Sequence, residues 1–106
     1  MTKLTVLTAD RIFDGGQFHQ NAALLIQDGR IQAITPQEQL PQNARTEEPN
    51  FACLVPGFVD WQVNGGGGVL FNEMPTATAA RAIARAHLRF GTTALLPTVI
   101  TDAPAV

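Results

Sequence analysis

The segment from Phe58 to Asn64 constrains the fold more than any other part of the sequence. It is short and rich in apolar and aromatic residues, it follows Pro56-Gly57, and four consecutive glycines come directly after it. These features predict a buried strand that ends in an open loop. Because side chains alternate along a strand, one face carries polar residues and the other apolar ones. The polar face holds Asp60, Gln62 and Asn64, and the apolar face holds Trp61 and Val63. Such polar groups need partners, either in an internal hydrogen-bond network or in a ligand.

A helix and a second strand are expected next. The helix runs from about Thr76, which can cap it, to about Phe90, and Gly91 suits its C-terminal end. One helix face is apolar (Ala79, Ile83, Ala86, Phe90), and another carries an arginine at every fourth position (Arg81, Arg85, Arg89). We expect this arginine stripe to be solvated. Residues 92 to 100 predict a strand in which Pro97 must end the strand, kink it or occupy an unpaired position. Strand, helix and strand together predict a βαβ unit with a parallel pair.

Residues 3 to 34 indicate β structure without a helix. Short apolar runs lie on either side of Ala9-Asp10, and Asp14-Gly15-Gly16 supplies a turn. Asp28-Gly29 joins two further runs and predicts a type I′ hairpin. Residues 35 to 50 are polar and contain prolines, so we expect a loop that separates two regions. The fold class is therefore α/β, with a small β-sheet or sandwich region over 1–54 and a second region over 55–106.

Composition excludes several classes of protein. With 45% hydrophobic and 15% charged residues, the chain is expected to be globular. A net charge of −2 and the lack of a basic tract argue against a nucleic-acid partner. The single cysteine, Cys53, excludes an internal disulfide framework and is expected to be a small buried residue. No stretch approaches the ~20 apolar residues of a membrane span, and no signal peptide is evident, so we expect a cytoplasmic protein without a membrane partner.

Three motifs carry a resemblance to a known family. Val-Pro-Gly-Phe followed by an aliphatic residue and Asp60 is similar to the way amidohydrolase-superfamily proteins enter their (β/α)8 barrel. Most of that superfamily then carries His-x-His, whereas this chain has Gln62-Val63-Asn64-Gly65, which resembles the N-acetylglucosamine-6-phosphate deacetylases. The segment from Gly91 to Thr98 is similar to the second barrel strand of the same family.

The resemblance implies a metal-dependent hydrolase of amino-sugar metabolism. Its reaction would convert N-acetylglucosamine 6-phosphate to glucosamine 6-phosphate and acetate. The family's metal, zinc or iron, is held by a glutamate and two histidines from later strands, and a late aspartate acts as acid and base. Gln62 and Asn64 stand where the superfamily has two histidines, and amide oxygens are poorer ligands for such metals than imidazole. The resemblance also implies a homo-oligomer.

This implied site is expected to be incomplete here. A (β/α)8 barrel takes ~250 residues, so the ligand-bearing strands are expected after Val106. We therefore expect no catalytic residue, no metal ligand and no tightly bound metal in this chain, and no deacetylase activity from it alone. Apolar surfaces that the rest of the barrel would cover favour association. Two alternatives stay open, namely another amidohydrolase with an altered metal site and a noncatalytic oligomeric β fragment.

The candidate site residues are Gln62, Asn64, Gly65 and Gly66, which we expect to line a substrate or metal pocket. The alternative for both amides is a polar layer in the barrel core. The glycine run can be a permissive loop on the catalytic face or a phosphate cradle, but no P-loop Lys-Ser/Thr follows it. Asp60 is expected to be a structural acceptor, and His19 and His87 are expected to stay outside the site.

Overall fold

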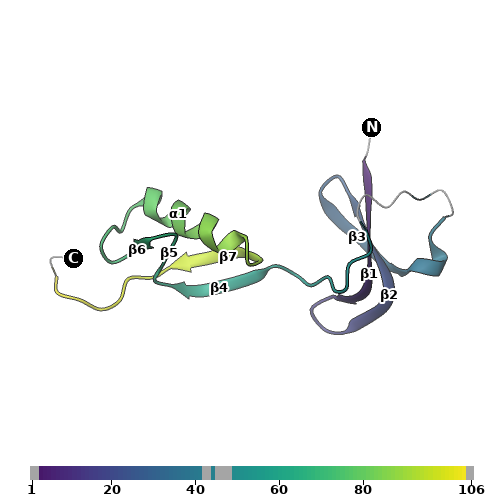
Figure 1. Cartoon of the computed structure of the whole chain (residues 1–106), viewed down its shortest axis with the longest axis horizontal. Coiled ribbons are helices and arrows are strands. Elements are labelled where there is room, and N and C mark those ends of the chain that lie inside the picture. Colours follow the sequence, from purple (N-terminus) through teal and green to yellow (C-terminus); the bar gives the residue numbers. More distant parts are fainter. Residues whose placement is uncertain (1–2, 42–43, 45–48, 105–106) are drawn as a thin grey trace. The chain divides into compact units, whose positions relative to one another are not determined.

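The computed structural model describes residues 3–41, 44 and 49–104, which form two compact units. One unit is Met1–Pro56 and the other is Gly57–Val106 (Figure 1). Strands account for most of the regular structure, and the second unit adds an α-helix. The predicted division into a β region over 1–54 and the start of a hydrolase barrel over 55–106 remains a prediction.

The first unit is built on a three-stranded antiparallel sheet. Its strands are β1 (Leu4–Phe13), β2 (Phe18–Gln27) and β3 (Arg30–Pro36), in the order β1-β2-β3. Asp28 and Gly29 have φ values of 52° and 76°, so the turn between β2 and β3 has the positive φ angles that the sequence predicts. The apolar residues on either side of Ala9-Asp10 belong to one strand, since β1 continues through both residues. Ala9 is fully buried there, and its small side chain lets the sheet pack closely.

The core of this unit lies under β1 and β2. It contains Ala9, Ile12 and Ala22, and the half-buried residues Leu24, Ile34, Phe51 and Leu54 pack against it. After β3, the chain forms a short 3-10 helix, η1 (Gln37–Gln39), and later returns beside β1. There Phe51 bridges Ala9 and Leu54 bridges Ile12, both in parallel orientation. The expectation of a buried Cys53 is wrong: it lies between these two bridging residues with its side chain exposed.

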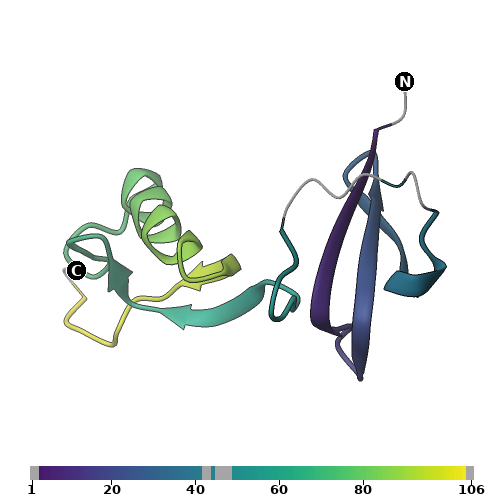
Figure 2. The ribbon, with the colours of Figure 1, turned by 45° about the vertical axis from the view of Figure 1, so that its right-hand side comes forward.

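The second unit is a strand, helix, strand arrangement. Strands β4 (Phe58–Val63) and β7 (Thr92–Pro97) pair in parallel, and helix α1 (Ala77–Leu88) connects them and packs against β7 (Figure 2). Thr76 caps α1, because its hydroxyl accepts a hydrogen bond of 3.2 Å from the Ala79 amide. The predicted βαβ unit is therefore present. Pro97 ends β7 three residues earlier than the predicted limit of the strand.

Helix α1 is shorter than the sequence predicts. It buries Ala79 and Ile83 and exposes Arg81 and Arg85. Arg89, at the C-cap, is also exposed, so the arginine stripe is exposed as expected. Phe90, however, lies beyond the end of the helix and is 64% exposed. The reversal of the chain at Gly91, where φ is 92°, follows directly and leads into β7. Phe90 therefore does not extend the apolar face of α1.

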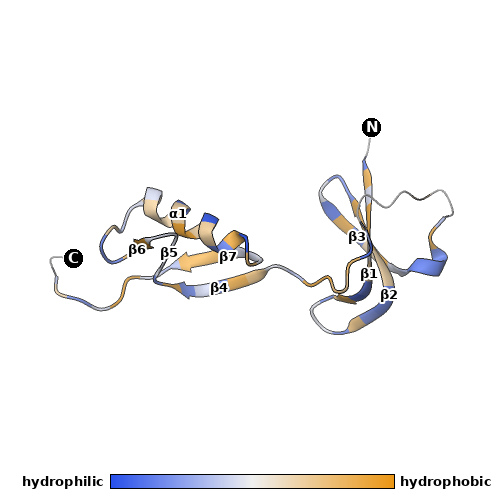
Figure 3. Ribbon diagram, viewed as in Figure 1, coloured by the Kyte–Doolittle hydropathy of each residue, from blue (hydrophilic) through white to orange (hydrophobic). Residues whose placement is uncertain are grey.

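The apolar side of β4 is only partly covered. Val63 is buried, whereas Trp61 is 82% exposed and Val59 is 76% exposed. Figure 3 shows apolar residues along both β4 and β7. The prediction of a buried strand therefore holds at the carboxyl end of β4 and is wrong for the rest of it within this structure.

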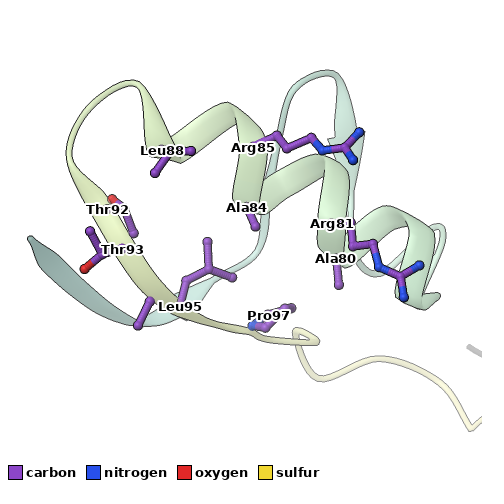
Figure 4. Close-up of a pocket in the computed structure, with 10 residues that line it drawn as sticks. Ala80, Arg81, Ala84, Arg85, Leu88, Thr92, Thr93, Leu95 and Pro97 are labelled. Carbon is purple, nitrogen blue, oxygen red and sulfur yellow. The ribbon is translucent and has the colours of Figure 1, made fainter. Parts of the chain in front are cut away.

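A hollow of about 490 Å³ separates α1 from one side of β7. Its wall is mostly apolar and includes Ala84, Leu88 and Leu95, which face one another in Figure 4. Arg81 and Arg85 border the hollow, and their guanidinium groups extend away from it. Across the described residues, no helix combines the length and apolar character needed to cross a membrane.

Candidate functional site

The carboxyl ends of β4 and β7 are held together by two asparagine side chains. The Asn64 amide donates a hydrogen bond of 3.1 Å to the Thr98 carbonyl oxygen. Asn72 donates through Nδ2 to the Ile100 carbonyl oxygen at 2.9 Å and accepts from the Ile100 amide at 2.7 Å. The chain beyond β7 is therefore fixed against the loop that follows β4. In parallel α/β folds this strand edge is where ligands bind.

Gln62 and Asn64 are on the same strand but have different surroundings. Asn64 is half-buried and its amide is engaged with Thr98, whereas Gln62 is exposed. Within the described part of the chain, the Gln62 side chain makes no hydrogen bond. Asp60 accepts a hydrogen bond of 3.1 Å from the Gln62 backbone amide, which suits a local structural role. Gln62 is thus the amide available to a ligand.

The four glycines form a tight hairpin instead of an open loop. β5 (Gly65–Gly66) pairs with β6 (Val69–Leu70), and Gly67 and Gly68 make the turn with φ values of 61° and 79°. Two consecutive positive φ angles are the reason for glycine at both turn positions. The hairpin packs against α1, since a side chain at Gly66 would collide with the His87 ring. The Nε2 atom of His87 lies 3.0 Å from the Gly65 carbonyl oxygen.

A second hollow, of about 770 Å³, lies beside this strand edge. Its lining includes Asn72, Glu73, Ile100 and Asp102. None of the four predicted site residues lines it. The lining combines apolar residues with the carboxylates of Glu73 and Asp102, and these two like charges disfavour an anion in the hollow.

The described residues do not fit a catalytic metal. Across residues 3–41, 44 and 49–104, no three His, Cys, Asp or Glu side chains come together in a metal-binding group. His19 lies in the first unit, where its Nε2 atom is 2.7 Å from Asp14. That hydrogen bond, together with the amides of Gln17 and Gly16, lowers the pKa of Asp14 to about 2. His87 is on α1 and contacts the glycine hairpin. No catalytic step through a metal can be assigned to these residues.

Sequence patterns missed three contacts at this edge, namely Asn64 with Thr98, Asn72 with Ile100, and His87 with Gly65. Asn72 follows a short hairpin and the Thr98–Ile100 segment follows a strand, and nothing in their spacing indicates that they meet. The contact between His87 and Gly65 joins residues 22 positions apart. Only the small residues of both partners, the glycines of the hairpin and the alanines of α1, hint at close packing.

Comparison with known proteins adds family information. Residues 6–48 match the model of a family described as the NagA composite domain. The chain is 39% identical over 103 residues to an N-acetylgalactosamine-6-phosphate deacetylase from Shewanella sp. (strain ANA-3), which covers 92% of this chain and 26% of that protein. It is 35% identical over 79 residues to an N-acetylglucosamine-6-phosphate deacetylase from Haemophilus influenzae, covering 74% of this chain and 21% of the relative.

A solved structure agrees with these matches. It is a variant N-acetyl-D-glucosamine-6-phosphate deacetylase from Mycobacterium smegmatis in complex with N-acetyl-D-glucosamine-6-phosphate, and it matches with a TM-score of 0.74 at 25% identity. The match covers 97% of this chain and 26% of that one. The resemblance to the N-acetylglucosamine-6-phosphate deacetylases is confirmed. The chain spans about a quarter of the length of these deacetylases.

Proposed function

We propose that this chain is the amino-terminal part of an enzyme that hydrolyses N-acetylglucosamine 6-phosphate to glucosamine 6-phosphate and acetate. The observation that carries the proposal is the 39% identity to a sugar-phosphate deacetylase over 92% of the chain. The match to a deacetylase structure holding N-acetyl-D-glucosamine-6-phosphate supports the same substrate class. The enzyme is proposed to be a cytoplasmic homo-oligomer in amino-sugar metabolism.

The second unit is proposed to begin a (β/α)8 barrel. β4, α1 and β7 have the connectivity of one barrel repeat, with a parallel strand pair and an intervening helix. In such barrels the catalytic groups gather at the carboxyl ends of the strands. Gln62, Asn64, Gly65 and Gly66 are at or just beyond that end of β4. They are proposed to line the substrate pocket.

The catalytic metal is proposed to be zinc or iron, held by donors outside the described residues. The Asn64 amide is engaged with Thr98, and among the described residues no three His, Cys, Asp or Glu side chains form a metal-binding group. The chain's own contribution is therefore to shape and orient the pocket. No acid, base or metal ligand is assigned to it.

The test is a deacetylation assay on the natural gene product that contains this chain. Acetate release is measured with N-acetylglucosamine 6-phosphate, with unphosphorylated N-acetylglucosamine, and with a cyclic amide. We expect turnover of the phosphorylated sugar that a chelator abolishes and added zinc or iron restores. Hydrolysis of the cyclic amide alone would instead support a different amidohydrolase.

A second substrate, N-acetylgalactosamine 6-phosphate, is favoured by one specific observation. The relative from Shewanella is named for this sugar and is more similar to the chain than the Haemophilus relative named for the glucosamine sugar, at 39% against 35% identity. The two sugars differ only in the orientation of one hydroxyl group. Comparing kcat/KM for both phosphates in the same assay decides which one the enzyme prefers.

A further inference from the structure

The imidazole of His87 connects α1 to the glycine hairpin. Its Nε2 atom lies 3.0 Å from the Gly65 carbonyl oxygen, and the contact is half-buried. A carbonyl oxygen can only accept, so Nε2 carries the proton and donates the hydrogen bond. In the neutral ring Nδ1 is then the unprotonated nitrogen. The contact therefore selects one tautomer of His87.

The hairpin backbone also packs directly on this ring. A Cβ atom at Gly66 would lie 2.8 Å from Nε2 and 3.0 Å from Cδ2 of His87. The positive φ angles of the turn belong to Gly67 and Gly68, and Gly66 has none. Glycine at position 66 is therefore explained by the space that His87 occupies and not by backbone conformation. The hydrogen bond and the close packing point to the same residue.

A glycine-rich segment needs such support. Glycine loses more conformational freedom on folding than any other residue, so a run of four is costly to hold in one conformation. β5 and β6 contribute only a two-residue ladder, which is marginal alone. The side chain of His87 adds a tie from a regular helix to the first residue of the hairpin. Gly65 directly follows Asn64, at the strand end where the proposed pocket lies.

We propose that His87 is a positioning residue, which holds Gly65 and Gly66 in place as one wall of the substrate pocket. His87 is not a catalytic residue, because it acts through the backbone of the hairpin. The proposed effect on catalysis rests on the proposed function. The hydrogen bond by which His87 connects α1 to the glycine hairpin does not depend on that function.

Three variants of the natural gene product test the proposal. His87→Ala removes the tie. His87→Gln restores a donor, because Nε2 of glutamine is the same number of bonds from Cα as Nε2 of histidine. Ile83→Val is the control, since Ile83 is fully buried on the same helix and its truncation weakens α1 packing without changing the contact with Gly65.

The first readout is kinetic. We expect His87→Ala to lower kcat/KM for the sugar phosphate by about tenfold, mainly through kcat, because a misplaced pocket wall disturbs alignment more than binding. The kcat/KM of His87→Gln should be within about threefold of the parent value. The kcat/KM of Ile83→Val should stay within about twofold of the parent value, even if its Tm falls as much as that of His87→Ala. Equal losses in His87→Gln and His87→Ala, or an equal loss in Ile83→Val, would overturn the proposal.

The second readout is independent of activity. Amide hydrogen exchange at Gly65 to Leu70 should be about tenfold faster in His87→Ala than in the parent, and unchanged in Ile83→Val. An unchanged exchange rate in His87→Ala would show that the His87 side chain does not stabilise the glycine hairpin. If the parent protein hydrolyses none of the sugar phosphates, the proposed function fails while the exchange result still decides the role of His87.

Discussion

At the level of single residues, Gln62 and Asn64 have the same functional group but different surroundings. The Asn64 side chain joins the ends of β4 and β7 through the Thr98 carbonyl oxygen, whereas the Gln62 side chain is exposed. The sequence predicts both amides on one face of a strand, and from that position alone their roles cannot be distinguished. Their difference arises because the chain beyond β7 returns to Asn64. Asn64 therefore has a structural contact, whereas the ligand-binding role of Gln62 remains a prediction that its exposure permits.

The two amides should therefore respond differently to truncation. Asn64→Ala should lower the free energy of unfolding by about 1 kcal/mol, because the half-buried Thr98 carbonyl oxygen loses its donor. Gln62→Ala should change it by less than about 0.5 kcal/mol, as expected for an exposed side chain. In the proposed deacetylase, Gln62→Ala should nevertheless lower kcat/KM, because the proposed pocket would lose this amide. Chemical denaturation and kinetics on the same two variants measure both effects, and a stability loss confined to Gln62→Ala would refute the assignment.

Asp14 is expected to make stability depend on acid pH. Its hydrogen bonds with His19 and with the amides of Gln17 and Gly16 lower its pKa from 3.8 to about 2. Because the pKa is lower in the folded state, the stabilisation is present above about pH 4 and is lost as the pH falls towards 2. Asp14→Asn keeps an acceptor for the amides but removes the charge. The difference in Tm between parent and variant should be largest above pH 4, shrink as the pH falls towards 2, and disappear only below about pH 2.

Carboxyl chemical shifts test the cause of this shift. In the parent, Asp14 should titrate near pH 2, and in His19→Ala its pKa should move back towards 3.8, because the largest contribution comes from His19. An Asp14 carboxyl that titrates at 3.8 in the parent would contradict the contact. Equal titration in parent and His19→Ala would assign the effect to the turn amides instead.

At the level of elements, the sequence predicts those turns and helix ends that are determined by residues adjacent along the chain. Asp28-Gly29 specifies its turn through two positive φ angles, and Thr76 specifies the start of α1 through its hydroxyl. The pairing of Gly65–Gly66 with Val69–Leu70 was not predicted, because a run of glycines has no side-chain pattern to show pairing. Contacts made after a long return of the chain, such as Phe51 beside Ala9, also leave no periodic signal. For the same reason the sequence indicates the strand end at which we propose the site and misses the residues that support that strand end.

Gln37 shows how one side chain joins several elements of the first unit. The two hydrogens on its Nε2 are shared among three acceptors, the carbonyl oxygens of Ala9 in β1 and Ala22 in β2, at 3.1 and 3.2 Å, and Asn50 Oδ1 at 3.0 Å. Gln37→Glu would put a carboxylate without donors against three oxygen atoms. We expect it to lower the free energy of unfolding by about 1–3 kcal/mol.

Gln39→Glu is the matched control for this prediction, because it introduces the same charge in the same 3-10 helix. Gln39 is exposed and only accepts a long hydrogen bond of 3.5 Å from Thr35. Its replacement should change stability by less than about 0.5 kcal/mol. Urea denaturation of both variants measures the difference in the free energy of unfolding. Equal losses in both variants would show that the added charge alone causes the loss and that the three contacts of Gln37 do not contribute.

At the level of the whole molecule, the two units differ in how much apolar surface they leave open. Large exposed apolar side chains in the second unit include Val59, Trp61, Phe90 and Leu96, each more than 60% exposed, whereas Ile31 is the comparable case in the first unit. Large exposed apolar side chains, where they gather into a patch, usually contact another part of a protein or a partner. The proposed barrel would cover β4 and β7 on both faces, since parallel strands are buried in such folds. The first unit instead has its own core around Ala9, Ile12 and Ala22.

Trp61, the single tryptophan of this chain, reports on this surface. In the 106-residue chain at low concentration, its 82% exposed indole should show water-like emission and be readily quenched by acrylamide. In the natural gene product, the difference between the parent and its Trp61→Phe variant isolates the same indole, and we expect it to be blue-shifted and protected. A dilution series separates two explanations for protection in the short chain. Protection that is lost on dilution indicates association through the exposed face of β4, whereas protection at every concentration would show that the strand packs differently and would contradict its exposure.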